Sequence, residues 1–299
     1  MKFTILGTGS ATPITERRPS AALLDLGNES ILLDCGEGTQ FQMLKYKVRF
    51  SRIKYILITH LHGDHFFGLI ALLNTLNNTG RTEPLVLIGP HGLQDIIGVQ
   101  LRYSLSFLNY TIDYRTTNPG AFEEVFSNEK ISISTIPLKH RIPCTGYLIS
   151  EKPALRKILA ERLPPDFPLP YFKMLKEGLD VEHEGKIYAN AEYTLAPASP
   201  KKVAYCSDTI FDLGIASYVY QADLLYHEST FTKELSARAQ MTFHSTAEQA
   251  ASIAKAAQVK QLIIGHFSSR YKDTSAFLTE AREIFQNTYL SEEGKTFRV

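Results

Sequence analysis

The chain has few cysteines, almost no net charge and no long hydrophobic run, and each shortage excludes a class of protein. Its three cysteines, Cys35, Cys144 and Cys206, are far apart and form no Cys-x-x-Cys pair, which argues against a disulfide framework and a thiolate zinc site. A formal net charge of +1 provides no general field for nucleic acid, so such a partner needs local basic patches. No apolar stretch approaches the ~18 residues that span a bilayer. The first residues lack a secretory pattern, so we expect a cytoplasmic protein with no membrane partner.

Short strand patterns and helical patterns are mixed along the 299 residues, which predicts sheets covered by helices. Strands are expected at 2–6, 20–26, 31–34, 55–59, 84–89, 130–138, 145–150, 201–206 and 261–265. Helices are expected at 66–76, 91–105, 246–258 and 275–286. Length alone leaves one large domain or two small ones open, and no Gly/Ser linker or repeat divides the chain.

One segment interrupts this alternation. Residues 151–200 contain seven prolines and few strand signals, and residues 151–176 carry six basic side chains against three acidic ones. The pattern indicates an insertion or arm on the main body. A solvated surface excursion explains it equally well.

The segment ITHLHGDHFFGL contains four ligand-type residues within six positions, directly after an apolar strand. His60 and His62 project to one side, because side chains of an extended chain alternate between faces. Gly63 then permits a tight turn that brings Asp64 and His65 round to a second position. One loop therefore offers ligands to two ions, and imidazole with carboxylate suits zinc, manganese or iron.

Four residues cannot fill two coordination spheres, so further ligands are expected at other strand ends. Three candidates, His140, Asp208 and His266, each follow an apolar strand pattern closely. Asp208 is suited to bridging, because a carboxylate has two oxygens and an anion between two cations reduces their repulsion.

The order of these motifs resembles the metallo-β-lactamase superfamily, and several details resemble ribonuclease Z within it. Those details are ILGTGSATP at 5–13, LLDCGEGTQ at 32–40, THLHGDHFFGL at 59–69, YCSDT at 205–209, HEST at 227–230, HSTA at 244–247 and GHFSSRY at 265–271. The resemblance covers nearly the whole chain and implies an α+β fold, a four-layer αββα sandwich.

The same resemblance assigns the ligands of two zinc ions per chain. His60, His62 and His140 would bind one ion, Asp64, His65 and His266 the other, and Asp208 would bridge them. It also implies a homodimer and a single domain over 1–299. An arm inserted at about 152–186 is a candidate tRNA-binding exosite, although it lacks the family's Gly-Pro pair.

The implied activity is removal of the 3′ trailer from precursor tRNA by a metal-activated water, which leaves a 3′-hydroxyl on the tRNA. Asp64 would accept a proton from that water or orient it. His244 would stabilise phosphate oxygens or protonate the leaving oxygen, oriented by Glu228, although a structural histidine near a helix cap is the alternative. The competing functions are hydrolysis of small phosphodiesters or other esters, and non-catalytic RNA binding. An incomplete ligand set would indicate the latter, and all seven ligands are present.

Overall fold

The computed structural model describes residues 1–299, which form two compact units. The first unit contains residues 1–126, 133–149 and 202–299, and the second contains residues 127–132 and 150–201. Each unit has its own apolar core. No helix in the chain is long and apolar enough to cross a membrane.

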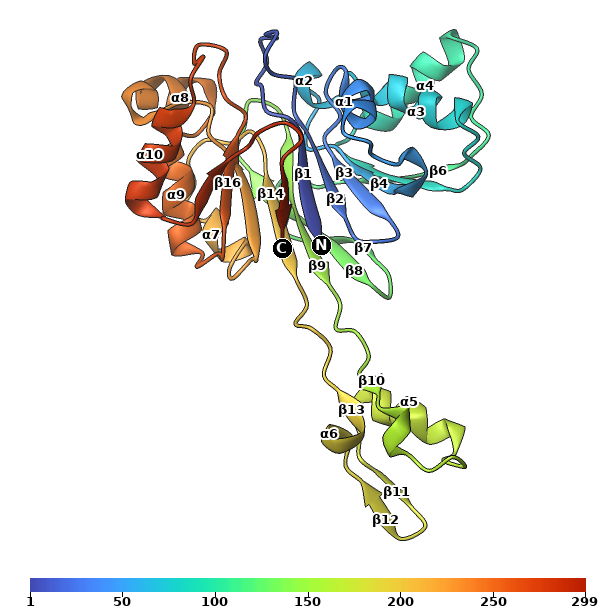
Figure 1. Cartoon of the computed structure of the whole chain (residues 1–299). Coiled ribbons are helices and arrows are strands. Elements are labelled where there is room, and N and C mark those ends of the chain that lie inside the picture. Colours follow the sequence, from blue (N-terminus) through green and yellow to red (C-terminus); the bar gives the residue numbers. More distant parts are fainter. The chain divides into compact units, whose positions relative to one another are not determined.

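Two seven-stranded sheets form the centre of the first unit (Figure 1). The first has the order β18 (Thr296–Arg298), β1 (Lys2–Gly7), β2 (Ala21–Asp25), β3 (Ser30–Leu33), β4 (Ile53–Leu57), β5 (Leu85–Gly89) and β6 (Ile112–Thr116). The second has the order β17 (Thr288–Leu290), β16 (Leu262–Gly265), β15 (Leu224–Glu228), β14 (Lys202–Cys206), β9 (Cys144–Glu151), β8 (Ile131–Leu138) and β7 (Glu124–Ser127).

The inner faces of the two sheets pack against each other. Phe3 of β1 is fully buried, and its ring centroid lies 6.0 Å from that of Tyr226 in β15. The hydroxyl of Tyr147, in β9, donates to the carbonyl of Ile58, just beyond β4, at 2.7 Å. Apolar side chains that alternate along each strand therefore fill one core between the sheets.

Helices cover the outer face of each sheet. Leu32 of β3 belongs to one buried cluster with Leu72 of α3 (Leu69–Asn78) and Ile97 of α4 (Leu93–Tyr103). On the second sheet, alanines of α9 (Ala247–Ala256) and Phe277 of α10 (Ser275–Ile284) belong to another buried apolar cluster, which includes Leu262 of β16. The layers are helix, sheet, sheet and helix, which confirms the expected α+β sandwich (Figure 1).

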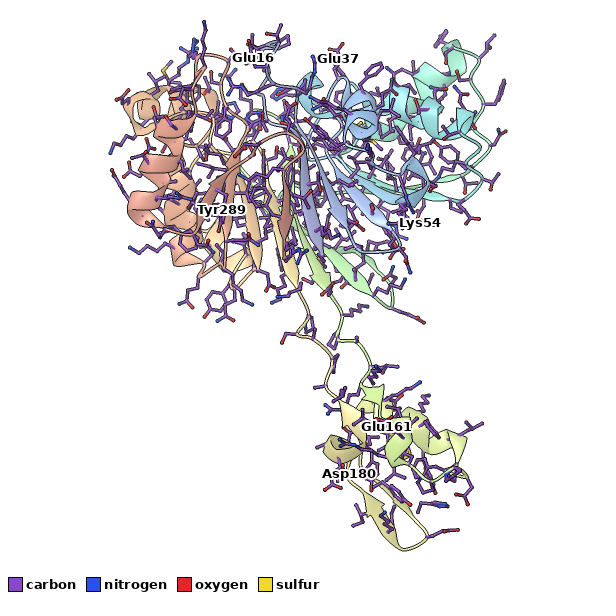
Figure 2. The ribbon with its side chains drawn as sticks, in the orientation of Figure 1. Glu16, Glu37, Lys54, Glu161, Asp180 and Tyr289 are labelled. Carbon is purple, nitrogen blue, oxygen red and sulfur yellow. The ribbon has the colours of Figure 1, made fainter.

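Parallel pairing at the centre of both sheets determines where the polar strand ends meet. β3, β4, β5 and β6 are parallel, as are β14, β15, β16 and β17. The carboxyl ends of parallel strands lie at one edge of a sheet, which is where open α/β sheets place ligands. Glu37 and Glu16 lie at this edge of the unit, near α2 (Gly63–Phe66) (Figure 2).

The second unit contains more secondary structure than its prolines suggested. It contains the strand pairs β10 (Lys157–Ile158) with β13 (Thr194–Leu195) and β11 (Val181–His183) with β12 (Lys186–Tyr188). It also contains α5 (Leu169–Glu177) and α6 (Asn190–Tyr193), and Glu161 and Asp180 lie within it (Figure 2). Its core comprises Leu163, Phe167, Leu175, Val181 and Tyr188. The expected arm at 152–186 falls inside this unit, which continues to residue 201.

Candidate metal centre

A one-turn helix that begins at Gly63 shapes the loop after β4. His62 has an extended backbone (φ −73°, ψ 144°) and precedes α2, in which Asp64 lies in the first turn and His65 in the last. The chain turns tightly here as predicted, since His65 N donates to the carbonyl of His62 at 3.0 Å, but Gly63 does so without a positive φ. A Cβ at this position would overlap the ring of Phe67, so a larger residue would displace that exposed ring.

The structure brings all seven sequence-predicted ligands into two neighbouring groups. In the first, the ligand atoms of His60, His62, His140 and Asp208 lie within 4.8 Å of one another, and in the second those of Asp64, His65 and His266 do so. His62 Nδ1 lies 3.1 Å from His60 Nε2 and 3.2 Å from His140 Nε2. Across the second group, the Nε2 atoms of His65 and His266 are 3.3 Å apart.

Asp208 presents one carboxylate oxygen to each group. Its Oδ2 lies 3.5 Å from His60 Nε2 and 3.6 Å from His140 Nε2. Its Oδ1 lies 3.4 Å from His65 Nε2 and 3.2 Å from His266 Nε2. This is the geometry that a bridging carboxylate requires.

Four of the five histidines have their outer nitrogen engaged by the protein. His65 Nδ1 is 2.8 Å from Asp34 Oδ2, and His140 Nδ1 is 2.9 Å from the carbonyl of Phe243. The other two contacts are His60 Nδ1 to the Thr59 hydroxyl at 3.0 Å and His266 Nδ1 to the Thr230 hydroxyl at 2.9 Å. Such partners hold the proton on Nδ1 and direct the Nε2 lone pair into the centre.

The donor set fits divalent metal ions. Burial, with the neighbouring His65, lowers the pKa of His60 well below its usual value, which leaves the neutral ring that a metal needs. At His65, burial lowers the pKa, but Asp208, Asp64 and Asp34 together raise it well above 6.5. The three carboxylates thus stabilise positive charge at a fully buried ring, and a bound divalent ion would provide that charge.

A second polar pair, His244 and Glu228, lies beside these ligands. Glu228 ends β15 and is fully buried, and its Oε1 lies 2.9 Å from His244 Nδ1. Glu228 also accepts hydrogen bonds from the backbone N–H groups of Thr209, Thr230 and Ser245. Burial lowers the pKa of His244, but the carboxylates of Glu228 and Asp208 raise it more, to about 9.

Two further groups hold the ligands. The sequence indicates that Asp34, in the LLDCGEGTQ motif, lies in a loop behind the ligands, with a plain turn as the alternative; in the structure it is fully buried and also accepts from Thr59 N and the Tyr205 hydroxyl. Thr230 connects His266 to Glu228, because its hydroxyl donates to Glu228 Oε2 at 2.8 Å. Asp34 follows a buried strand directly, as the ligands do, and that signal was available in the sequence.

The two groups open into a cleft of about 820 Å³. His62, Asp64 and His244 line it, together with residues 10–13 of the loop after β1. Three arginines also line it, namely Arg141, Arg238 and Arg270. None of the three forms an ion pair, so the cleft combines carboxylates and imidazoles at its base with free cations in its wall.

Comparison with known proteins places this arrangement in a family. A family model described as anti-Pycsar protein Apyc1 matches residues 1–155, which include His60–His65 and His140 but not Asp208 or His266. A protein named ribonuclease Z from Cytophaga hutchinsonii is 46% identical over 297 residues, which cover 99% of this chain and 95% of that protein. The chain belongs to the ribonuclease Z family.

Solved structures agree with this membership of the ribonuclease Z family. Human tRNase Z, short form, has a TM-score of 0.73 and 28% identity, with 100% of this chain and 99% of that chain covered. The metallo-β-lactamase fold protein YhfI from Bacillus subtilis has a TM-score of 0.69 at 17% identity, covers 99% of both chains, and supports the fold alone.

Proposed function

We propose that this ribonuclease Z family member is a zinc-dependent endoribonuclease that removes the 3′ trailer from precursor tRNA. One observation carries the proposal: a complete set of seven buried or partly buried ligand-type side chains lies beside the His244–Glu228 pair in a cleft with unpaired arginines. The names of the full-length relatives supply the substrate. The product would be a tRNA with a 3′-hydroxyl and a trailer with a 5′-phosphate, since the bond between phosphorus and the 3′ oxygen breaks.

The two groups of ligands would hold two zinc ions, with Asp208 between them. His60, His62 and His140 would hold one ion, and Asp64, His65 and His266 the other. When bound, the ions supply a water of lowered pKa and positive charge next to the scissile phosphate. Asp64 is the cleft-lining carboxylate on this loop, so it would orient that water and accept its proton.

His244 would act on the leaving oxygen. Its Nδ1 faces Glu228, so its Nε2 is available to the cleft. With a pKa near 9 the ring carries a proton at neutral pH, and an imidazolium can donate it to the 3′ oxygen as the bond to phosphorus breaks. Arg141, Arg238 and Arg270 would contact the flanking phosphates, because guanidinium groups match phosphate geometry.

The direct test uses a 3′-extended precursor tRNA with zinc-loaded protein. We expect one cut that separates the trailer from the tRNA, and no cut by an Asp64→Ala variant or after removal of metal by a chelator. The proposal fails if the wild type leaves the precursor intact under conditions in which it contains two zinc ions per chain.

We further propose that the second unit is the tRNA-binding exosite. Its 151–176 segment carries six basic side chains, and its core packs α5 against the short strand β11. Basic side chains of this segment suit RNA, because neutralising phosphates releases counterions, whereas the four acidic residues at 177–184 would lie away from the RNA. The cytoplasmic location expected from the sequence stays a prediction.

A homodimer is also proposed, on the evidence of exposed apolar side chains. Phe41 and Leu44, on α1 (Thr39–Lys45), are 66% and 62% exposed, and Tyr103, the last residue of α4, and Phe107, in the loop after it, are each 81% exposed. Exposed apolar side chains grouped this way are typical of an interface. Light scattering should give twice the chain mass for wild type and the chain mass for Phe41→Asp/Leu44→Asp. A monomeric wild type contradicts the proposal.

A further inference from the structure

A second cleft lies on the outer face of the first sheet, away from the metal centre. It has a volume of about 660 Å³ and is lined by strands β18, β1, β2 and β3 and by the loop after α1. Lys2 alternates along β1 with the inward-facing Phe3, so its side chain points outward. We call this cleft the basic groove.

Five cations line the basic groove: Lys2, Lys47, Arg49, Arg52 and Arg298. Asp25 is the single carboxylate in the lining, and it accepts a hydrogen bond from Gly27 N and makes no ion pair. None of the five cations has a carboxylate within salt-bridge distance. A net charge of +1 over the whole chain makes this local excess of four positive charges a marked concentration. Unpaired like charges repel one another, so the groove favours an anionic occupant.

The cations are too widely spread for one small anion. Lys2 and Arg298 are register partners on neighbouring strands, whereas Arg52 precedes Ile53, the register partner of Ser30 on β3. β18 and β3 are three strand spacings apart, or roughly 14 Å. A chain with a phosphate on every nucleotide can contact cations spread over this width, whereas a single phosphate cannot.

The basic groove is also separate from the metal centre. Lys2 begins β1 and Ser30 begins β3, whereas Asp34 and the metal loop follow the opposite ends of β3 and β4. Five residue steps from Lys2 to Gly7 span roughly 17 Å of strand. A ligand in the groove therefore does not touch the metal ligands, and an RNA that contacts both must extend beyond its cleavage site.

We propose that the basic groove binds the phosphodiester backbone of RNA at a point remote from the scissile bond. This inference rests on the proposed function, which supplies RNA as the substrate. The contact is electrostatic, because five cations and a single carboxylate line the groove. It would strengthen substrate binding without taking part in the chemical step.

The test compares two triple variants of the full-length protein. The groove variant is Lys47→Gln/Arg49→Gln/Arg298→Gln, three exposed residues. The matched control, Lys202→Gln/Lys233→Gln/Lys255→Gln, removes the same charge from exposed lysines outside both clefts. For each protein, kcat, KM and equilibrium binding of a labelled precursor tRNA are measured from 50 to 300 mM salt. Hydrolysis of bis-p-nitrophenyl phosphate is measured alongside.

For the groove variant we expect KM and Kd for the precursor to rise about tenfold near 0.15 M salt. The slope of log Kd against log salt should fall by about 2, at ~0.7 for each lost phosphate contact. The kcat and hydrolysis of the small diester should match the control. Equal Kd and salt slope in groove and control variants would overturn the proposal. Binding of tripolyphosphate to both variants is measured as well. If the groove variant loses tripolyphosphate binding but binds RNA as the control does, the groove is a small-anion site and the proposal is overturned.

Failure of the proposed function gives a different pattern. Wild-type protein would then leave the precursor uncut, while the binding measurement would still report on the groove. Weaker RNA binding by the groove variant, together with no cleavage by the wild type, would refute the proposed function and leave the groove proposal standing.

Discussion

At the scale of single residues, the site depends on which nitrogen of each histidine is free. Thr59, Asp34, Thr230 and a backbone carbonyl engage the outer nitrogens of four rings. His62 is the exception, because its Nδ1 faces the other ligands. The ligands are therefore oriented before any ion binds, which lowers the entropic cost of binding.

His244 gives the sharpest test at this scale. We expect His244→Ala to lower kcat for precursor cleavage by about 10²–10⁴, the usual contribution of a general acid. Zinc content should remain that of wild type, because the seven ligands are unchanged. Single-turnover kinetics and metal analysis check both statements. A large loss of zinc with the loss of rate would instead make His244 a ligand.

The pH dependence of the metal-free protein tests the His244–Glu228 pair independently. The folded pKa of His244 is raised from 6.5 to about 9, so its stabilisation is complete below pH 6.5 and is lost as pH rises through 9. The free energy of unfolding of wild type minus that of His244→Gln should fall by at most about 3 kcal/mol between pH 6.5 and 9.5. Urea unfolding at several pH values measures it, and a constant difference would contradict the pairing.

The sequence predicted individual site residues correctly where a ligand-type side chain directly follows an apolar strand. His60, His140, Asp208 and His266 all follow apolar strand patterns, and the structure brings them together. Asp34 follows a strand equally closely, but an aspartate just ahead of the glycine-containing segment CGEG is also typical of a turn. The contacts of Thr230 depend on the folding of distant segments against each other, which no local pattern reveals.

At the scale of elements, the N-terminus of α9 holds His244 and Ser245 in place. Thr246 is its N-cap: its hydroxyl accepts from Gln249 N, and the Gln249 side chain accepts from Thr246 N. This capping box defines the start of the helix that the sequence predicts at 246–258. The hydroxyl of Ser245 donates to the carbonyl of Thr209, next to Asp208.

Thr246→Ala should therefore destabilise the protein by about 1 kcal/mol, or roughly 2–4 °C in Tm, through loss of the cap. Ser252→Ala, within the same helix, is the matched control and should change Tm much less. Differential scanning calorimetry measures both. Equal Tm values for the two variants would show that the capping box adds nothing.

The sequence predicted the nine strands and four helices with clear periodicity, each of which overlaps an observed element. It missed β15, whose sequence LLYHE is buried throughout and ends in two polar residues. It also missed β6, which alternates weakly and is largely exposed. In β15 the polar end is buried by contacts with distant segments, so local strand propensity could not reveal this strand.

At the scale of the whole molecule, the chain is a metal-binding sandwich with a separate compact insertion. Strand and helix patterns predicted sheets covered by helices, and the resemblance to ribonuclease Z implied the four-layer sandwich. The second unit was harder, since seven prolines between 151 and 200 conceal its short strands and helices. Its core forms from aromatic side chains distant in sequence.

Deleting this insertion tests its proposed role. Glu151 N donates to the carbonyl of Lys201 at 2.8 Å, so a short glycine linker can replace residues 152–200. We expect at least ~10-fold lower kcat/KM on precursor tRNA, about 1.4 kcal/mol of lost binding, with hydrolysis of a small phosphodiester retained. Equal losses on both substrates would show that the insertion supports the fold, and no loss on either would contradict an exosite.

The central claim is that the metal centre cuts precursor tRNA at the junction with its trailer. The most direct measurement maps the cut on an end-labelled precursor and identifies the new ends, with Asp64→Ala in parallel. The account predicts a single cut at the tRNA 3′ end, with a 3′-hydroxyl on the tRNA and a 5′-phosphate on the trailer, and none with the variant. Cuts scattered along the RNA, a 3′-phosphate on the tRNA, or equal cutting by Asp64→Ala would contradict it.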